Sequence, residues 1–124
     1  MATNYFEVTA KSKSGKNIKA EMDEIMGRIH ENDDLNGDIE DDFYPASTSN
    51  DIYRVEIESE FYHIEDALVD FLVEVTDEYP DLAFEIIQTF EGDQYYRHIF
   101  ADGDHEEFQG EIMFPSNERL KYFD

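Results

Sequence analysis

Residues 64–79 have the sequence IEDALVDFLVEVTDEY, and this stretch decides the fold. Its apolar residues recur at steps of three and four, which places them on one face of an α-helix. They are Ile64, Ala67, Leu68, Phe71, Leu72, Val75 and Tyr79. Pro80 lacks a backbone donor and disfavours helix in the residue before it, so we expect the helix to end at Tyr79. A helix with one apolar face needs a second layer to pack against.

The opposite face of this helix is acidic. Four carboxylates follow at steps of four, four and three: Asp66, Asp70, Glu74 and Asp77. Because each residue rises about 1.5 Å, the helix presents one charge about every 6 Å. The stretch contains no Lys or Arg, so the sequence predicts an unneutralised row of acids, which we call the helix stripe.

Composition predicts one folded domain with a negative surface. The chain has 124 residues and a formal net charge of −23, from 32 acids and nine bases. High charge often indicates disorder, but 40% hydrophobic residues in periodic patterns favour a packed core. The sequence has no cysteine, which excludes disulfides and thiolate metal sites. It shows neither a leader-like N-terminal pattern nor a long apolar run, so we expect a cytoplasmic protein, in the host cytoplasm if phage-encoded.

The first half of the chain predicts three strands, one of them short, and a helix. Residues 5–10 alternate as a strand, and residues 17–30 form a helix that buries Ile18, Met22, Ile25, Met26 and Ile29. A short strand is expected near 39–44. The clearest strand is 52–61, which should bury Tyr53, Val55, Ile57 and Phe61 and expose Arg54, Glu56, Glu58 and Glu60.

After the helix of residues 64–79, residues 83–90, 95–101 and 106–114 alternate as three strands. Turns at Glu91-Gly92-Asp93 and Asp102-Gly103-Asp104 join them into an antiparallel meander. The chain shows no repeat and no linker. We therefore predict a single domain over 1–124, an α+β two-layer sandwich with two helices on one face of a mostly antiparallel sheet. A ferredoxin-like arrangement is one way to build it.

Charge is also segregated along the chain. From Ile29 to Glu118 there are 27 acids and only two bases, Arg54 and Arg97. Within this region Glu56, Glu58 and Glu60 recur at every second position of a strand, about 6.6 Å apart, and we call them the strand row. A nucleic-acid strand carries phosphates at a comparable spacing, and the two strands of a duplex together give one charge per about 1.7 Å of axis. Charged rows of this kind therefore suit a basic groove that normally holds nucleic acid. Solubility or adaptation to high salt would also explain the charge.

Other patterns in the sequence are weaker indications of a metal site or a catalytic site. Residues 32–43 align with a calcium loop, with Gly37 at the sharp turn and Asn32, Asp34, Asn36, Asp38 and Glu40 at ligand positions. Phe43 stands where the bidentate Glu should be, so an acidic loop is the simpler interpretation. The cluster around Asp102, Asp104, His105, Glu106 and Glu107 fits a turn and a solvated strand end. No nucleophile or phosphate-loop motif is present, and we expect no enzyme activity.

Two resemblances bear on function. Residues 79–104, YPDLAFEIIQTFEGDQYYRHIFADGD, resemble the helix-end-and-hairpin pattern of Api92-like domains of phages and plasmids. In size and charge the chain resembles small acidic phage-encoded inhibitors, the anti-CRISPR and anti-restriction proteins that mimic nucleic acid. The second resemblance rests on composition and implies an inhibitor without catalytic residues.

We therefore expect an acidic binding protein that inhibits a basic nucleic-acid-binding partner, a CRISPR effector or a restriction or nuclease enzyme, by mimicking polyanion charge. The expected binding residues are the strand row and the helix stripe. The protein itself should bind no nucleic acid, membrane or cofactor. An immunity protein or antitoxin against a basic nuclease toxin would use the same physics, and a weak calcium-binding domain remains a further alternative.

Overall fold

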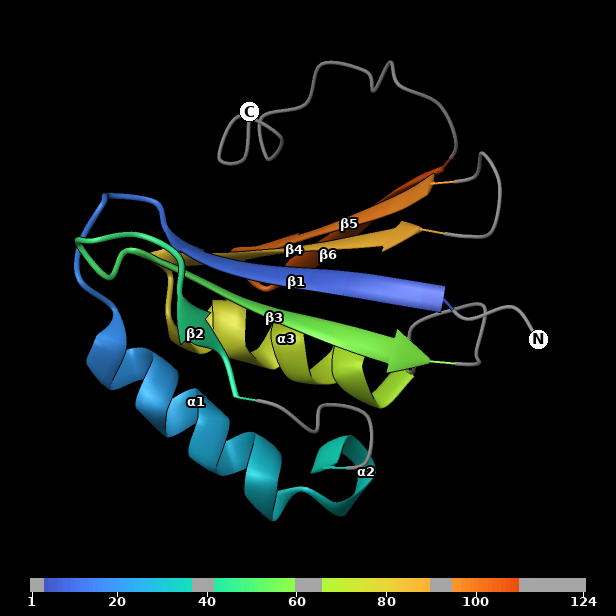
Figure 1. Ribbon diagram of the computed structural model, residues 1–124, viewed down its shortest axis with the longest axis horizontal. Coiled ribbons are helices and arrows are strands. Elements are labelled where there is room, and N and C mark those ends of the chain that lie inside the picture. The colour runs from blue at the N-terminus through green and yellow to red at the C-terminus, as the bar shows by residue number, and fades with distance from the viewer. Residues whose placement is uncertain (1–3, 37–41, 60–65, 90–94, 110–124) are drawn as a thin grey trace.

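The computed structural model describes residues 4–36, 42–59, 66–89 and 95–109. Its elements are β1 (Asn4–Ser12), α1 (Lys19–Glu31), α2 (Asp33–Asn36), β2 (Tyr44–Pro45), β3 (Ile52–Ser59), α3 (Asp66–Glu78), β4 (Leu82–Thr89), β5 (Tyr95–Ala101) and β6 (Asp104–Gln109). The strands form one six-stranded sheet, and the helices lie together on one face of it (Figure 1). This confirms the predicted α+β two-layer class.

The sheet is antiparallel throughout, in the order β2-β3-β1-β4-β5-β6. The series β1-α1-β2-β3-α3-β4 follows the ferredoxin-like order, because β1 is inserted between β3 and β4. The strands β5 and β6 extend the sheet beyond β4 as a meander. The long central strand is therefore the first along the chain.

Register explains which side chains meet the helices. In β1, Phe6 lies opposite Ile57, and Val8 lies opposite Val55. Because side chains alternate across a strand, these residues share the helix-covered face, and all four are buried. The intervening residues Glu7 and Glu56 lie opposite each other on the other face, which no helix of the described residues covers and which we call the helix-free face.

The helix α3 confirms the periodicity of its sequence. Its buried residues include Leu68, Phe71, Leu72 and Val75, as predicted. Thr76 is also fully buried, which the apolar pattern did not indicate. The helix ends at Glu78, close to the predicted end beside Pro80.

The helix α1 begins two residues later than its sequence pattern suggested. The backbone N–H of Ile18 donates to Asn50 O at 2.9 Å, which ties this residue to the loop before β3. Asn17 Oδ1 instead accepts from the N–H of Lys19 at 2.9 Å. Residues 17 and 18 therefore precede the helix, although Ile18 is buried in the core as expected.

Two strand boundaries differ from expectation. The strand expected near 39–44 is reduced to Tyr44–Pro45 within the described chain, and residues 39–41 lie outside it. The last strand begins at Asp104, two residues early, because the turn contains only Asp102 and Gly103, with φ angles of 54° and 76°. Two positive φ values fit the hairpin turn that Asp-Gly favours. The expected strand residues beyond Gln109, Phe61 of the earlier strand, and the turn at 91–93 lie outside the described residues. In the described ranges, no helix has the length and apolar character needed to cross a bilayer.

Candidate acidic binding surfaces

The strand row lies on β3, on the helix-free face of the sheet. Glu56 is exposed and lies opposite Glu7 of β1. Glu58 occupies the position opposite Tyr5 in the backbone register, two residues further along the strand. Glu60 lies outside the described residues. The structure thus places the first two positions of the row on one strand, with the period that the sequence predicted.

The charge around the strand row is only partly compensated. Like charges directly opposite each other, as Glu7 and Glu56 are, destabilise a sheet. Arg54 Nε lies 3.9 Å from Glu7 Oε1, and both side chains are about half exposed. This pairing therefore offsets the repulsion weakly.

A second ion pair lies nearer the centre of the same sheet face. Arg97 Nε donates to Glu85 Oε2 at 2.6 Å, and the two side chains are only 12% and 10% exposed. Burial of both partners makes this pair structural, since removing one would leave a buried uncompensated charge. Glu85 therefore contributes little negative field to the surface, whereas Glu56 does.

The helix stripe also faces solvent, as predicted. Asp66, Asp70, Glu74 and Asp77 are all exposed on α3. The stripe is not wholly unneutralised, however, and this part of the prediction is wrong. Arg28 Nη2 donates to Glu74 Oε1 at 3.4 Å and Nη1 donates to Glu78 Oε2 at 2.6 Å.

Arg28 reaches these acids because α1 packs beside α3. Its guanidinium also lies 5.4 Å from the centroid of the Phe71 ring, within the range of a cation–π contact. The arginine therefore joins the two helices and compensates part of the charge of Glu74 and Glu78 on α3. Among the described residues, Asp66, Asp70 and Asp77 have no ion pair.

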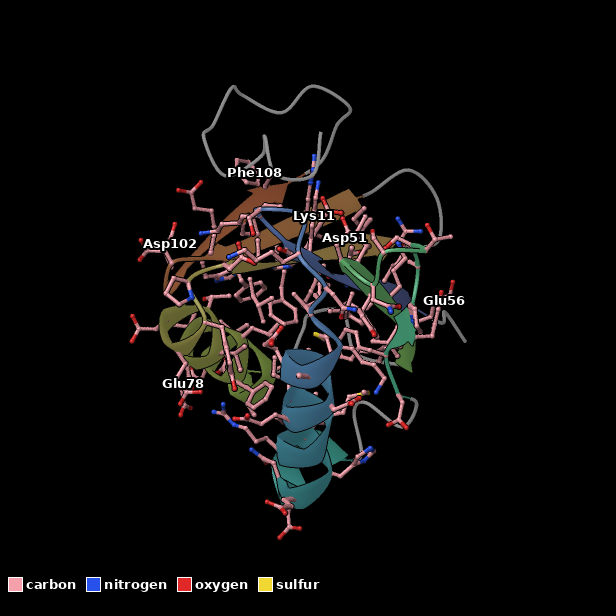
Figure 2. The ribbon with its side chains drawn as sticks, turned by 90° about the vertical axis from the view of Figure 1, so that its left-hand side faces the viewer. Lys11, Asp51, Glu56, Glu78, Asp102 and Phe108 are labelled. Atoms are coloured by element: carbon pink, nitrogen blue, oxygen red, sulfur yellow. The ribbon has the colours of Figure 1, made fainter. Side chains whose placement is uncertain are left out.

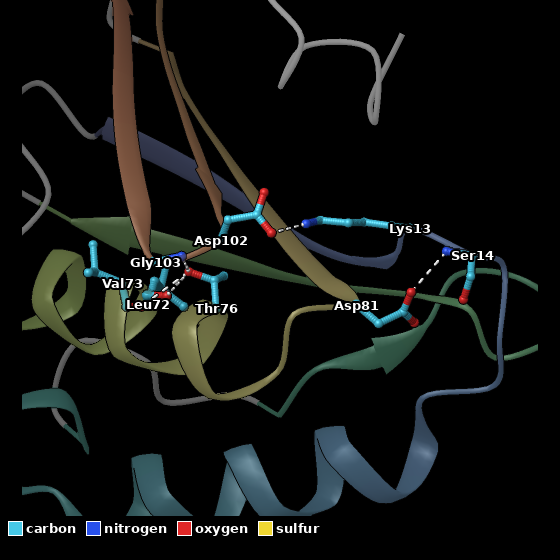
Figure 3. Close-up of polar contacts among 8 residues, drawn as sticks. All are labelled: Lys13, Ser14, Leu72, Val73, Thr76, Asp81, Asp102 and Gly103. Carbon is cyan, nitrogen blue, oxygen red and sulfur yellow. Dashed lines mark hydrogen bonds and ion pairs between the residues drawn. The ribbon is translucent and has the colours of Figure 1, made fainter.

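The end of the helix stripe meets the β5–β6 turn. Thr76 Oγ1 accepts from the N–H of Gly103 at 3.1 Å and donates to Leu72 O at 3.0 Å (Figure 3). A Cβ atom placed on Gly103 would lie 3.0 Å from Asp77 Oδ1, so this glycine allows the carboxylate to approach closely. The α3 acids are therefore continuous with the start of the edge strand β6.

In the lysine-rich loop after β1, a lysine side chain and a backbone N–H are paired with acids of the same chain. Lys13 Nζ lies 2.6 Å from Asp102 Oδ1, and the N–H of Ser14 donates to Asp81 Oδ1 at 3.1 Å (Figure 3). Although burial raises the pKa of the Asp81 carboxyl, hydrogen bonds from Ser12 and Ser14 outweigh it and lower the pKa overall. Lys19 similarly pairs with Asp23 at 2.8 Å. The loop thus satisfies internal carboxylates.

The two acidic rows occupy different sides of the molecule. Figure 2 shows Glu56 and Glu78 on opposite sides, with Glu78 on α3 and Glu56 on β3. The strand row belongs to the helix-free face of the sheet, and the helix stripe belongs to the outer side of the helix layer. The two rows therefore form separate candidate surfaces.

The calcium-loop candidates divide between helix and residues outside the described chain. Asn32 ends α1, and Asp34 and Asn36 belong to the short helix α2, whose Leu35 is fully buried. Asp38 and Glu40 lie outside the described residues. Within the described ranges, no group of three His, Asp or Glu residues could hold a metal ion. His30 Nε2 lies 2.6 Å from Asp42 Oδ1, which links the end of α1 to the chain before β2.

Sequence patterns gave no indication of a histidine pair in the last hairpin. His98 Nδ1 lies 3.0 Å from His105 Nε2, and the two rings are stacked with an angle of 16° between their planes. His105 also stacks on Phe100, with ring centroids 4.5 Å apart. Burial lowers the pKa of His105, and the nearby Glu107 carboxylate opposes this shift. The two histidines therefore link β6 to β5 through their side chains.

Comparison with known proteins identifies no relative: no family model, no curated protein and no solved structure matches this chain.

Proposed function

We propose that this protein binds a basic nucleic-acid-binding protein and inhibits it by occupying its nucleic-acid site as a polyanion mimic. A CRISPR effector or a restriction or nuclease enzyme is the class of partner that this chemistry suits. The proposal concerns binding through surface charge, and no catalytic step is part of it.

One observation carries the proposal: most of the described bases are engaged with other acids and do not neutralise the two rows. Lys13, Lys19, Arg54 and Arg97 pair with Asp102, Asp23, Glu7 and Glu85, and only Arg28 reaches the helix stripe. Glu56, Asp66, Asp70 and Asp77 therefore present negative charge on a strand and a helix of the folded domain. When such a surface binds a basic groove, counterions are released, which favours binding. Little free energy is lost in ordering the surface, because it already belongs to folded elements.

The strand row is our first choice for the contact surface. A strand holds its charges in a straight line, whereas Arg28 compensates part of the helix stripe. The experiment nevertheless tests both the strand row and the helix stripe.

The test compares three charge-reversed proteins that differ only in location. One carries Glu56→Lys, Glu58→Lys and Glu60→Lys, and the second carries Asp66→Lys, Asp70→Lys and Asp77→Lys. The matched control carries Glu21→Lys, Glu31→Lys and Asp33→Lys on α1 and α2, which changes the net charge equally. Each protein is used to capture basic nucleic-acid-binding proteins from a nuclease-treated bacterial lysate, with and without added DNA.

We expect the wild type and the control to retain a partner that DNA displaces, and one of the two row variants to lose it. Loss should exceed about tenfold in affinity, because a close charge pair in an interface contributes roughly 1.5 kcal/mol or more. Binding should also weaken steeply with salt. If both row variants bind as the control does, the charge serves solubility and the proposed function is wrong.

A further inference from the structure

The two edges of the sheet are not equivalent. At one edge β2 contributes two residues and ends at Pro45, which has no N–H to offer a further strand. At the other edge β6 is six residues long, and within the described chain no strand lies beyond it. Among the described strands, only β6 therefore offers a regular ladder of backbone groups at its outer edge.

The hairpin turn fixes which backbone groups of β6 face outward. Ala101 and Asp104 flank the two-residue turn, so they form the first hydrogen-bonded pair, and bonded pairs alternate from there. Glu106, opposite Ile99, therefore directs its N–H and C=O toward β5. His105 and Glu107 direct theirs away from the sheet.

This edge is held in place by side chains on two sides. The His105 ring is hydrogen-bonded to His98 and also stacks on the ring of Phe100. The turn at Gly103 is bonded to the buried Thr76 hydroxyl of α3. Because the edge strand is already ordered, an added strand would lose little free energy in ordering β6.

The charges of β6 determine which kind of strand could pair with its outer edge. Asp104 and Glu107 are exposed and Glu106 is half-buried, and the strand contains no Lys or Arg. A second copy of the same edge would place acids against acids, which disfavours pairing between identical chains. An extended segment bearing Lys or Arg would instead meet opposite charge while forming backbone hydrogen bonds.

We propose that β6 is a docking edge for an extended basic segment of the partner protein, which adds to the sheet as a seventh strand beside His105 and Glu107. The inference rests on the proposed function for the positive charge of the partner, and on the sheet geometry for the mode of binding. The same segment would lie close to Asp77, since this carboxylate adjoins the turn that leads into β6. Main-chain bonds supply affinity in such additions, and side-chain charges supply selectivity.

The experiment separates strand addition from plain charge attraction with two probe peptides. The first alternates lysine with valine. The second has the same side chains and charge, but carries N-methyl groups on the alternate backbone nitrogens that would face β6. We expect the first peptide to bind at least about tenfold more tightly, because methylation removes several hydrogen bonds and leaves the charge unchanged. Amide exchange should slow at His105 and Glu107, and should change little at Glu106, which already bonds to β5.

Two substitutions at one position provide the matched control. Glu107→Pro removes an outward N–H, and proline is tolerated where an edge N–H faces solvent, so this variant should weaken the first peptide by about fivefold to tenfold. Glu107→Gln keeps the N–H and removes the charge, so it should weaken both peptides alike. If Glu107→Pro does not fold, the two peptides on the unaltered protein still decide the question.

Equal binding of the two peptides, with no selective slowing of exchange at His105 and Glu107, would overturn the docking edge and leave the proposed polyanion function standing. Failure of both peptides to bind would overturn the docking edge and also contradict the proposed function, since neither charge nor backbone would then attract a basic strand.

Discussion

Replacing Thr76 by valine should destabilise the protein through a single hydrogen bond. The Thr76 hydroxyl is fully buried and accepts from the Gly103 N–H at 3.1 Å, while donating to Leu72 O at 3.0 Å. Valine has almost the same shape, so no cavity forms. Leu72 O keeps its bond from the helix backbone, but the N–H of Gly103 loses its partner. A fully buried donor left without an acceptor costs about 1–3 kcal/mol, and because Gly103 is only partly buried we expect a loss near the lower end of that range.

The assay is urea unfolding of the wild type, Thr76→Val and Thr76→Ser at neutral pH, with amide exchange at Gly103 as a local readout. Serine keeps the hydroxyl and loses one methyl group, so it should cost only about 0.8 kcal/mol. The Gly103 amide should exchange faster in the valine variant alone. If valine costs no more than serine, or leaves Gly103 exchange unchanged, the hydroxyl does not anchor the β5–β6 turn and the reasoning is refuted.

Three further outcomes follow from charge and packing. Added salt should raise the free energy of unfolding at about pH 7 by screening the unpaired acids, and thermal melts that do not change with salt would contradict this. Because burial lowers the pKa of His105 below 6.5, its contribution to stability is full above that pH and is lost as the pH falls through the folded-state pKa. Between about pH 7 and pH 5, His105→Gln should therefore lose less stability than the wild type, a difference that parallel melts measure. Phe71→Ala should cost about 3–5 kcal/mol through the cavity it leaves, and should also loosen Arg28, which urea unfolding of the double variant with Arg28→Ala would detect as non-additivity.

The elements that the sequence predicted well are those with a local period. Alternation in β3 and the three-and-four spacing of α3 each identify a buried face within one segment, and Tyr53, Val55 and Leu72 are buried accordingly. Thr76 departs from this rule, because it is a polar residue on the buried face. Its polar side chain is buried only because a turn distant in sequence supplies a partner, Gly103.

The features that the sequence did not predict depend on contacts between distant segments. Arg28 and Glu74 are 46 residues apart, so the helix stripe appeared unneutralised when the segment was considered alone. The histidine pair likewise requires the register of β5 against β6, which places His98 one step diagonally from His105. Charge composition predicted an acidic surface, but it could not indicate that the two acidic rows lie on opposite sides of the molecule.

The position of β1 has a consequence for how the chain folds during synthesis. The strand is synthesised before the other described strands of the sheet, yet its neighbours are β3 and β4, so Tyr5 is paired on both sides only after Thr89 has been made. Closing such long loops is slow, since the entropy cost precedes the gain from contacts. Phe6 and Val8 therefore remain incompletely covered until β4 has been made, a state in which many chains aggregate. The acids that accumulate after Ile29 give each nascent chain a growing negative charge, which keeps neighbouring chains on a polysome apart until the last strands arrive.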